Sequence, residues 1–239
     1  MRLLLISNST MPGKPYLDYP KHEIQKFLGN DPLKILFIPY AAVTFSYDEY
    51  VEKVNERFAE IGQEVTGIHT YSNPQKAVRK ADAIVVGGGN TWQLVRKMNE
   101  YNLMPAIRDC VLSGTSYIGW SAGSNVACPT LRTTNDMPIV DPLGFNCTNL
   151  VPFQINPHYL DANPEGHGGE TREERIREFL EINPDTFVAG LREGTMFCID
   201  NKKIRLIGDR ECRIFYNGRE PQELSASDDF SFLLNYGAN

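Results

Sequence analysis

The feature that most constrains the fold is a repeated alternation of short apolar runs with helical patterns over the first 120 residues. Apolar runs at 3–7 and 34–39 are brief and closed by turn residues, which is typical of strands buried on both faces. Comparable runs lie at 65–69, 83–86 and 115–119. Because consecutive strands are separated by helices, the pattern predicts a mostly parallel sheet with helices covering both faces.

The clearest helix of this series spans residues 47–61. Its apolar residues recur at three- and four-residue spacing, which places them on one helical face. Ser46 and Glu49 have the spacing of a capping box at its start, and Gly62 is suited to end it. The apolar face consists of Tyr47, Tyr50, Val51, Val54, Phe58 and Ile61.

After residue 185 the pattern changes to short strands joined by turns. Strands are expected at 186–191, 195–200, 203–207 and 213–216. Turns of the Asn-Gly kind favour hairpins, so we expect antiparallel strands at the edge of the same sheet. No Pro/Gly/Ser linker or internal repeat divides the chain, which predicts a single α/β domain over residues 1–239.

Charge and composition exclude several classes of partner. With a net charge of −6, the chain lacks the excess of basic residues that binding a nucleic-acid backbone requires, so we expect no nucleic-acid partner. No apolar run is long enough for a membrane helix or a signal peptide, so we expect no membrane partner and a cytoplasmic protein. Five widely spaced cysteines without a Cys-x-x-Cys pair argue against disulfides and against a structural metal site.

Residues 119–123 carry the motif Gly-Trp-Ser-Ala-Gly, which fits G-x-S-x-G. It follows an apolar strand and precedes a small-residue helical run, 122–128, as a nucleophile elbow requires. The flanking glycines allow the tight packing of such a turn, and the helix N-terminus favours negative charge nearby. The motif predicts that Ser121 is a nucleophile.

An attacking serine needs a base to accept its proton, and the chain has only four histidines. His22 and His69 lie in segments where a structural role is expected. His158 follows an apolar stretch, whereas His167 lies in a Gly-rich segment. A base must be held rigidly, so we favour His158 over His167.

A third group should hold the imidazole in the correct tautomer. Asp136 lies between the serine and the histidine in the chain, and Glu193 follows an apolar strand. The sequence supports the two carboxylates almost equally. Glu193 is slightly favoured because a residue at the end of a strand is held more rigidly.

The segment Gly87-Gly88-Gly89-Asn90 ends the preceding strand. It lacks the spacing of a dinucleotide-binding loop and the lysine of a phosphate loop, so we expect no cofactor. Its exposed backbone amides suit a different role. The N–H groups of Gly88 or Gly89, together with that of Ala122, are predicted to form an oxyanion hole.

These segments together resemble the peptidase E family, the α-aspartyl dipeptidases. The resemblance is carried by residues 7–10, 87–91, 119–123, 132–138, 154–158, 164–167 and 169–173. It implies a fold similar to class I glutamine amidotransferase domains rather than to α/β-hydrolases. It also implies a metal-independent serine exopeptidase for dipeptides with an N-terminal aspartate, with Ser121 as nucleophile and His158 as base. The third member has been read in the family both as the residue matching Asp136 and as that matching Glu193.

An aspartyl dipeptide carries a side-chain carboxylate, and the protein has a net charge of −6. A local positive charge must therefore attract this carboxylate into the site. Arginine suits a carboxylate best, and Arg172, Arg175 and Arg132 are the candidates. Arg172 is favoured because it stands at a helix start beside a Gly-rich loop, residues 167–169, that could act as a lid.

Two other functions remain open at this stage. One is a serine esterase or acyl transferase of the same fold, and the other is a non-enzymatic module that binds a small molecule. The chain is expected to act as a monomer or a homodimer.

Overall fold

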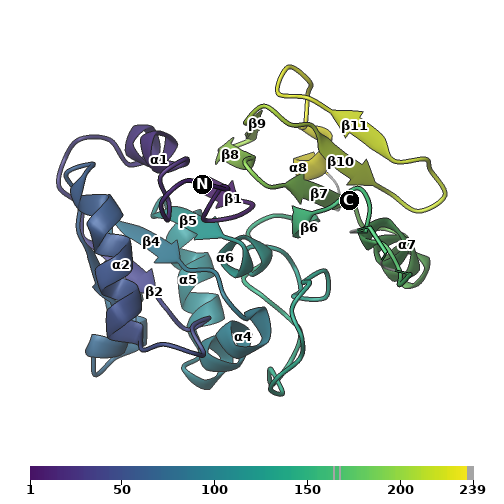
Figure 1. Cartoon of the computed structure of the whole chain (residues 1–239). Helices are drawn as coiled ribbons and strands as arrows, with labels where there is room; N and C mark the ends of the chain where they lie inside the picture. Colours follow the sequence, from purple (N-terminus) through teal and green to yellow (C-terminus); the bar gives the residue numbers. More distant parts are fainter. Residues whose placement is uncertain (164, 167, 236–239) are drawn as a thin grey trace.

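Two sheets form the framework of the protein in the computed structural model, which describes residues 1–163, 165–166 and 168–235 (Figure 1). The larger sheet has seven strands in the order β3-β2-β4-β5-β1-β8-β9. Its first five strands are parallel, and β8 and β9 continue it in antiparallel fashion. The strands are β1 (Arg2–Ile6), β2 (Ile35–Ile38), β3 (Val65–Gly67), β4 (Ala83–Val86), β5 (Ser116–Trp120), β8 (Met196–Asp200) and β9 (Lys203–Ile207).

The smaller sheet has four strands in the order β11-β10-β7-β6. They are β6 (Gln154–Tyr159), β7 (Val188–Arg192), β10 (Cys212–Phe215) and β11 (Gln222–Leu224). The expectation that all four late strands extend the first sheet is correct for β8 and β9 and wrong for β7 and β10. The reason is β6, which pairs in parallel with β7 and begins the second sheet.

Helices cover both faces of the larger sheet, as the alternation predicts. Alternate side chains of β1 point to opposite faces, so Leu4 packs with α1 and α2, whereas Leu3 packs with α3, α4 and α5. The helices are α1 (Lys21–Leu28), α2 (Tyr47–Ala59), α3 (Pro74–Val78), α4 (Thr91–Glu100) and α5 (Leu103–Leu112). The predicted capping box of Ser46 and Glu49 is present at the start of α2.

The two sheets share a hydrophobic core. Leu191 of β7 and Ile214 of β10 belong to the same buried cluster as Leu3 and Leu5 of β1. On the outer side of the smaller sheet, α7 (Arg172–Ile182) packs Ile176 and Leu180 against Tyr159, Val188 and Phe215. Buried side chains of both sheets therefore form one continuous cluster.

The remaining elements are short. A 3-10 turn, η1 (Ile68–Thr70), replaces the end of the strand predicted at 65–69, and α6 (Ala122–Asn125) and α8 (Phe232–Asn235) are each about one turn long. Among the helices in the described part of the chain, none has the length and apolar character needed to cross a membrane.

The carboxyl ends of the parallel strands meet at one edge of the larger sheet. Ser7 follows β1, Gly87 follows β4 and Ser121 follows β5 at this edge. Because β6 runs parallel to β7, the end of β6 and the residue after β7 lie close to each other. The sequence-predicted residues therefore meet where the two sheets adjoin.

Candidate active site

Ser121 stands at a sharp turn between β5 and α6, with φ 52° and ψ −112°. Its backbone N–H donates to the carbonyl of Ile6 at 3.0 Å. The hydroxyl of the buried Ser124 donates toward the carbonyls of Ile6 at 2.7 Å and Gly119 at 2.8 Å. A Cβ at position 123 would overlap the carbonyl oxygen of Val86, so Gly123 is required for this close packing. The elbow predicted from the motif is thus held by two neighbouring strands.

His158 lies near the end of β6, where the register with β7 shifts. Its φ of 53° is unusual for a non-glycine residue and turns the side chain toward the elbow. Its backbone N–H donates to the hydroxyl of Ser7 at 3.0 Å, and that hydroxyl donates to the carbonyl of Leu191 at 2.7 Å. The buried Ser7 therefore fixes the backbone of His158.

The imidazole of His158 contacts both expected partners. Its Nε2 lies 3.0 Å from Oγ of Ser121, and its Nδ1 lies 2.7 Å from Oε1 of Glu193. The carboxylate accepts a hydrogen bond from Nδ1–H and so holds the proton on Nδ1, which leaves Nε2 free to accept the serine proton. The side chains of His158 and Glu193 are 40% and 35% exposed, so water reaches this pair.

Asp136 lies elsewhere, at the start of α4. Its Oδ2 accepts hydrogen bonds from the backbone N–H of Thr91 at 2.7 Å, from the Thr91 hydroxyl at 2.6 Å and from the Thr134 hydroxyl at 3.1 Å. An acidic group there satisfies a free N–H and interacts favourably with the helix dipole. Of the two candidates for the third member, the structure brings Glu193, and not Asp136, to His158.

The predicted oxyanion-hole residues adjoin the serine. A Cβ built on Gly88 would lie 3.1 Å from Cβ of Ser121, so the Gly88 backbone packs directly on this serine. Within the described residues, the N–H groups of Gly88 and Gly89 have no hydrogen-bond acceptor. Ala122 is the first residue of α6, where a helix leaves its N–H groups free. These amides are available to a ligand oxygen.

Arg172 starts α7 and lines a small cavity of about 60 Å³ with Arg132, Asn135, Asn156 and Arg175. Burial and then the like charge of Arg175 lower the pKa of Arg172, while Asp136 opposes this shift. Arg175 pairs with Glu170 at 3.5 Å, and Arg132 lies over the ring of Phe145. Among the described residues Arg172 has no ion-pair partner, so its guanidinium is free to meet a carboxylate.

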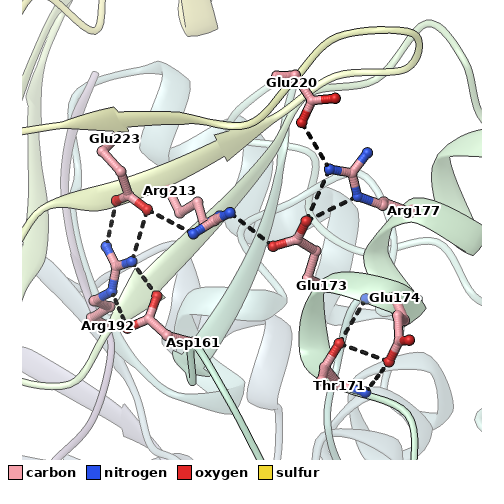
Figure 2. A network of polar contacts seen from close by, with 9 residues as sticks. All are labelled: Asp161, Thr171, Glu173, Glu174, Arg177, Arg192, Arg213, Glu220 and Glu223. Atoms are coloured by element: carbon pink, nitrogen blue, oxygen red, sulfur yellow. Dashed lines mark hydrogen bonds and ion pairs between the residues drawn. The ribbon is translucent and has the colours of Figure 1, made fainter.

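A network of charged side chains surrounds Arg192, which ends β7 and directly precedes Glu193 in the chain (Figure 2). Arg192 binds Asp161, three residues after His158, and Glu223 on β11, with an Nη1–Oε2 distance of 2.7 Å for the latter. These two carboxylates raise the pKa of Arg192, and Arg192 in turn lowers the pKa of Asp161. Arg213 links Glu223 to Glu173 of α7. The network joins the ends of β6 and β7 to the outer helix.

Neither of the other two histidines in the described part of the chain is hydrogen-bonded to Ser121. His69 pairs with Asp48 at 2.8 Å, His22 lies on α1, and His167 lies outside the described residues. All five cysteines are free thiols. In the described ranges, no cluster of three or more His, Cys, Asp or Glu side chains could hold a metal ion.

Sequence reasoning missed two supports of this site. Ser7 lies in the segment 7–10 that resembles the family, and its hydroxyl bridges β6 and β7. Arg192 directly precedes Glu193 in the sequence, yet its guanidinium binds Asp161 and Glu223. Neither role has a local sequence signal, because each depends on contacts between distant strands.

The family model described as peptidase family S51 matches residues 3–207. The chain belongs to this family. It is 52% identical to a protein named peptidase E from Nostoc sp., over 98% of this chain and 96% of that protein. It is 49% identical to a protein of the same name from Salmonella newport, over 96% of this chain and 100% of the relative. The expected resemblance to peptidase E and the expected class, a peptidase, are confirmed.

Solved structures support the same fold. A crystal structure of a Listeria monocytogenes EGD-e protein aligns with a TM-score of 0.66 at 23% identity, over 87% of this chain and 98% of that one. A peptidase from an acI-B1 Actinobacterium aligns with a TM-score of 0.71 at 18% identity, over 97% and 96%. The predicted α/β class, with a mostly parallel sheet and antiparallel strands near the C-terminus, is confirmed.

Proposed function

We propose that this S51 chain is a serine dipeptidase that hydrolyses dipeptides with an N-terminal aspartate, with Ser121, His158 and Glu193 as its catalytic triad. The observation that carries the proposal is the pair of contacts at His158, 3.0 Å to the Ser121 hydroxyl and 2.7 Å to the Glu193 carboxylate. Full-length relatives named peptidase E, at about half identical residues, support the same activity.

The reaction proceeds through an acyl-enzyme. Oγ of Ser121 attacks the carbonyl carbon of the peptide bond while its proton passes to Nε2 of His158. Glu193 stabilises the imidazolium that forms. The amides of Ala122 and of Gly88 or Gly89 stabilise the negative charge on the carbonyl oxygen. His158 then donates the proton to the leaving amine, and a water molecule, deprotonated by the same imidazole, hydrolyses the aspartyl ester and restores Ser121.

Arg172 supplies the preference for aspartate. Its unpaired and partly buried guanidinium lines a cavity with Asn135 and with Asn156, two residues before His158, and suits the side-chain carboxylate of the substrate. The surrounding protein is acidic overall, so this local charge must provide the attraction. The five free thiols support a reducing compartment such as the cytoplasm.

The test is hydrolysis of Asp-Leu, Asn-Leu and Glu-Leu by the purified chain and by Ser121→Ala. Turnover of Asp-Leu well above the other two, abolished in the variant with its fold intact, is expected. Comparable turnover by Ser121→Ala would exclude the serine mechanism. A simple ester and glutamine, assayed in parallel, separate a peptidase from an esterase or acyl transferase. A serine that a phosphonofluoridate leaves unmodified, in a chain without turnover, would indicate a binding module.

A further inference from the structure

Tyr50 is a core residue of α2 by its sequence pattern, yet its hydroxyl reaches the proposed oxyanion loop. The hydroxyl lies 2.9 Å from the carbonyl oxygen of Gly88, 3.2 Å from Nε1 of Trp120 and 3.0 Å from the hydroxyl of Tyr16. The side chain of Tyr50 is only 3% exposed. A fully buried hydroxyl with three polar partners, one of them next to the nucleophile, calls for a role beyond packing.

The chemistry of the partners fixes the direction of each hydrogen bond. An indole N–H only donates and a backbone carbonyl only accepts, while a phenol hydroxyl has one proton and two lone pairs. Trp120 therefore donates to Tyr50, and Tyr50 donates to Gly88. With its one proton used, Tyr50 accepts from Tyr16. Burial raises the pKa of Tyr50 to about 12, which keeps that proton in place at any working pH.

The bond from Tyr50 restrains one particular peptide group. In a trans peptide the carbonyl of Gly88 and the N–H of Gly89 point in opposite directions within one rigid plane. Anchoring the carbonyl therefore also orients the N–H, which has no acceptor among the described residues. The close approach depends on Gly87, because a Cβ there would lie 2.7 Å from the Tyr50 hydroxyl.

The Tyr50 hydroxyl is also linked to the proposed nucleophile, through Trp120. Trp120 directly precedes Ser121, and its ring stacks on Phe37 with the centroids 5.8 Å apart. Its indole N–H ends on the same hydroxyl that holds Gly88. The Tyr50 hydroxyl thus couples the position of the Ser121 turn, after β5, to the position of the glycine loop, after the adjacent strand β4.

We propose that Tyr50 is a positioning residue that holds the Gly88–Gly89 peptide against Ser121 so that the oxyanion hole is preorganised. This inference rests on the proposed serine mechanism. Outright loss of one oxyanion-hole donor lowers kcat by about 10²–10³-fold. Loss of a group that only orients such a donor should cost less, about tenfold to a hundredfold.

The test compares Tyr50→Phe with Tyr40→Phe, a matched control. Tyr40 is equally buried, at 2% exposed. Among the described residues, its hydroxyl makes no hydrogen bond to the glycine loop, residues 87–89. Tyr50→Phe should lower kcat for Asp-Leu about tenfold to a hundredfold, with KM within about twofold and the pH dependence unchanged. Tyr40→Phe should retain wild-type kcat.

Thermal unfolding of both variants separates positioning from stability. Should Tyr50→Phe fold poorly, Tyr16→Phe keeps the Tyr50 hydroxyl but removes one of its donors, and it should lower kcat severalfold. Unchanged kcat in a folded Tyr50→Phe, or a loss matched by Tyr40→Phe, would refute the proposal.

A second reaction keeps this test independent of the substrate. Phosphonylation of Ser121 by a phosphonofluoridate also places an oxygen in the oxyanion hole, so Tyr50→Phe should slow the inactivation. If the wild type is phosphonylated but does not cleave Asp-Leu, the proposed substrate is wrong while the role of Tyr50 is still measured. Equal inactivation rates in the wild type and Tyr50→Phe would contradict the positioning role directly.

Discussion

Glu193→Gln tests the electrostatic part of the proposed triad. Glutamine can keep the hydrogen bond to Nδ1 of His158 but removes the negative charge, now 2.7 Å away. Charge centres about 4 Å apart interact by about 4 kcal/mol at an effective dielectric constant of 20 and by about 1 kcal/mol in water. Because both side chains are more than a third exposed, at 40% and 35%, we expect a value between these limits. This range corresponds to a fall in kcat/KM of about fivefold to a thousandfold.

The assay is kcat/KM for Asp-Leu at one fixed pH. Without the carboxylate the imidazolium formed during catalysis is less stable, so kcat/KM should fall in Glu193→Gln. Asp136→Asn is the isosteric control. It removes the charge at the start of α4, which should cost about 0.3–1 kcal/mol of stability and lower Tm by a few degrees at most, and its kcat/KM should stay within about twofold of the wild type. A large fall in kcat/KM in Asp136→Asn, with Glu193→Gln within twofold of the wild type, would refute the choice of Glu193.

The remaining predictions concern specificity, acid stability and the thiols. Arg172→Met should reduce the preference for Asp-Leu over Asn-Leu at least tenfold. Arg175→Met is the control, because Arg175 is paired with Glu170, and it should leave this preference unchanged. An unchanged ratio of Asp-Leu to Asn-Leu turnover in both variants would mean that another residue binds the substrate carboxylate. Arg192 lowers the pKa of Asp161 below its ordinary value of 3.8, so this pair stabilises the folded state above about pH 4 and the contribution is lost as the pH falls further. The drop in Tm between pH 6 and pH 3 should therefore be smaller in Asp161→Asn, and an identical drop would contradict this. Burial raises the pKa of Cys128 to about 12, so native protein at pH 8 should resist iodoacetamide at Cys128 and keep its activity, as mass spectrometry and an assay of the same sample would show.

The parts of the fold that could be predicted are those with local signals. The capping box at Ser46, the apolar strand 83–86 and the elbow at Ser121 each depend on a few neighbouring residues, and each has the expected form. The strand β6 could not be predicted with equal clarity because Asn156 and Pro157 interrupt its apolar pattern. Its pairing with β7 is what removes β7 and β10 from the edge of the first sheet.

The same limit applies to the site. Ser121 and His158 could be chosen from the sequence because one has a motif and the other is one of only four histidines. The choice between Glu193 and Asp136 depends on which strand lies beside β6, and no local pattern contains that information. Tyr50 carries the periodicity of a core residue, and its hydroxyl acquires a polar role only because β4 and β5 bring Gly88 and Trp120 to it.

The hydroxyl of Ser7 links three separate pieces of chain, since it follows β1, accepts from the backbone of His158 and donates to the carbonyl of Leu191. Ser121, the proposed nucleophile, follows β5 of the larger sheet, whereas the proposed base His158 and acid Glu193 lie on or directly after strands of the smaller one. Any partial unfolding that lets the smaller sheet detach would separate the base from the nucleophile while the larger sheet remains folded. Catalysis should therefore fail at a lower denaturant concentration than the bulk secondary structure, and amide exchange in β6 and β7 should follow the loss of activity rather than global unfolding.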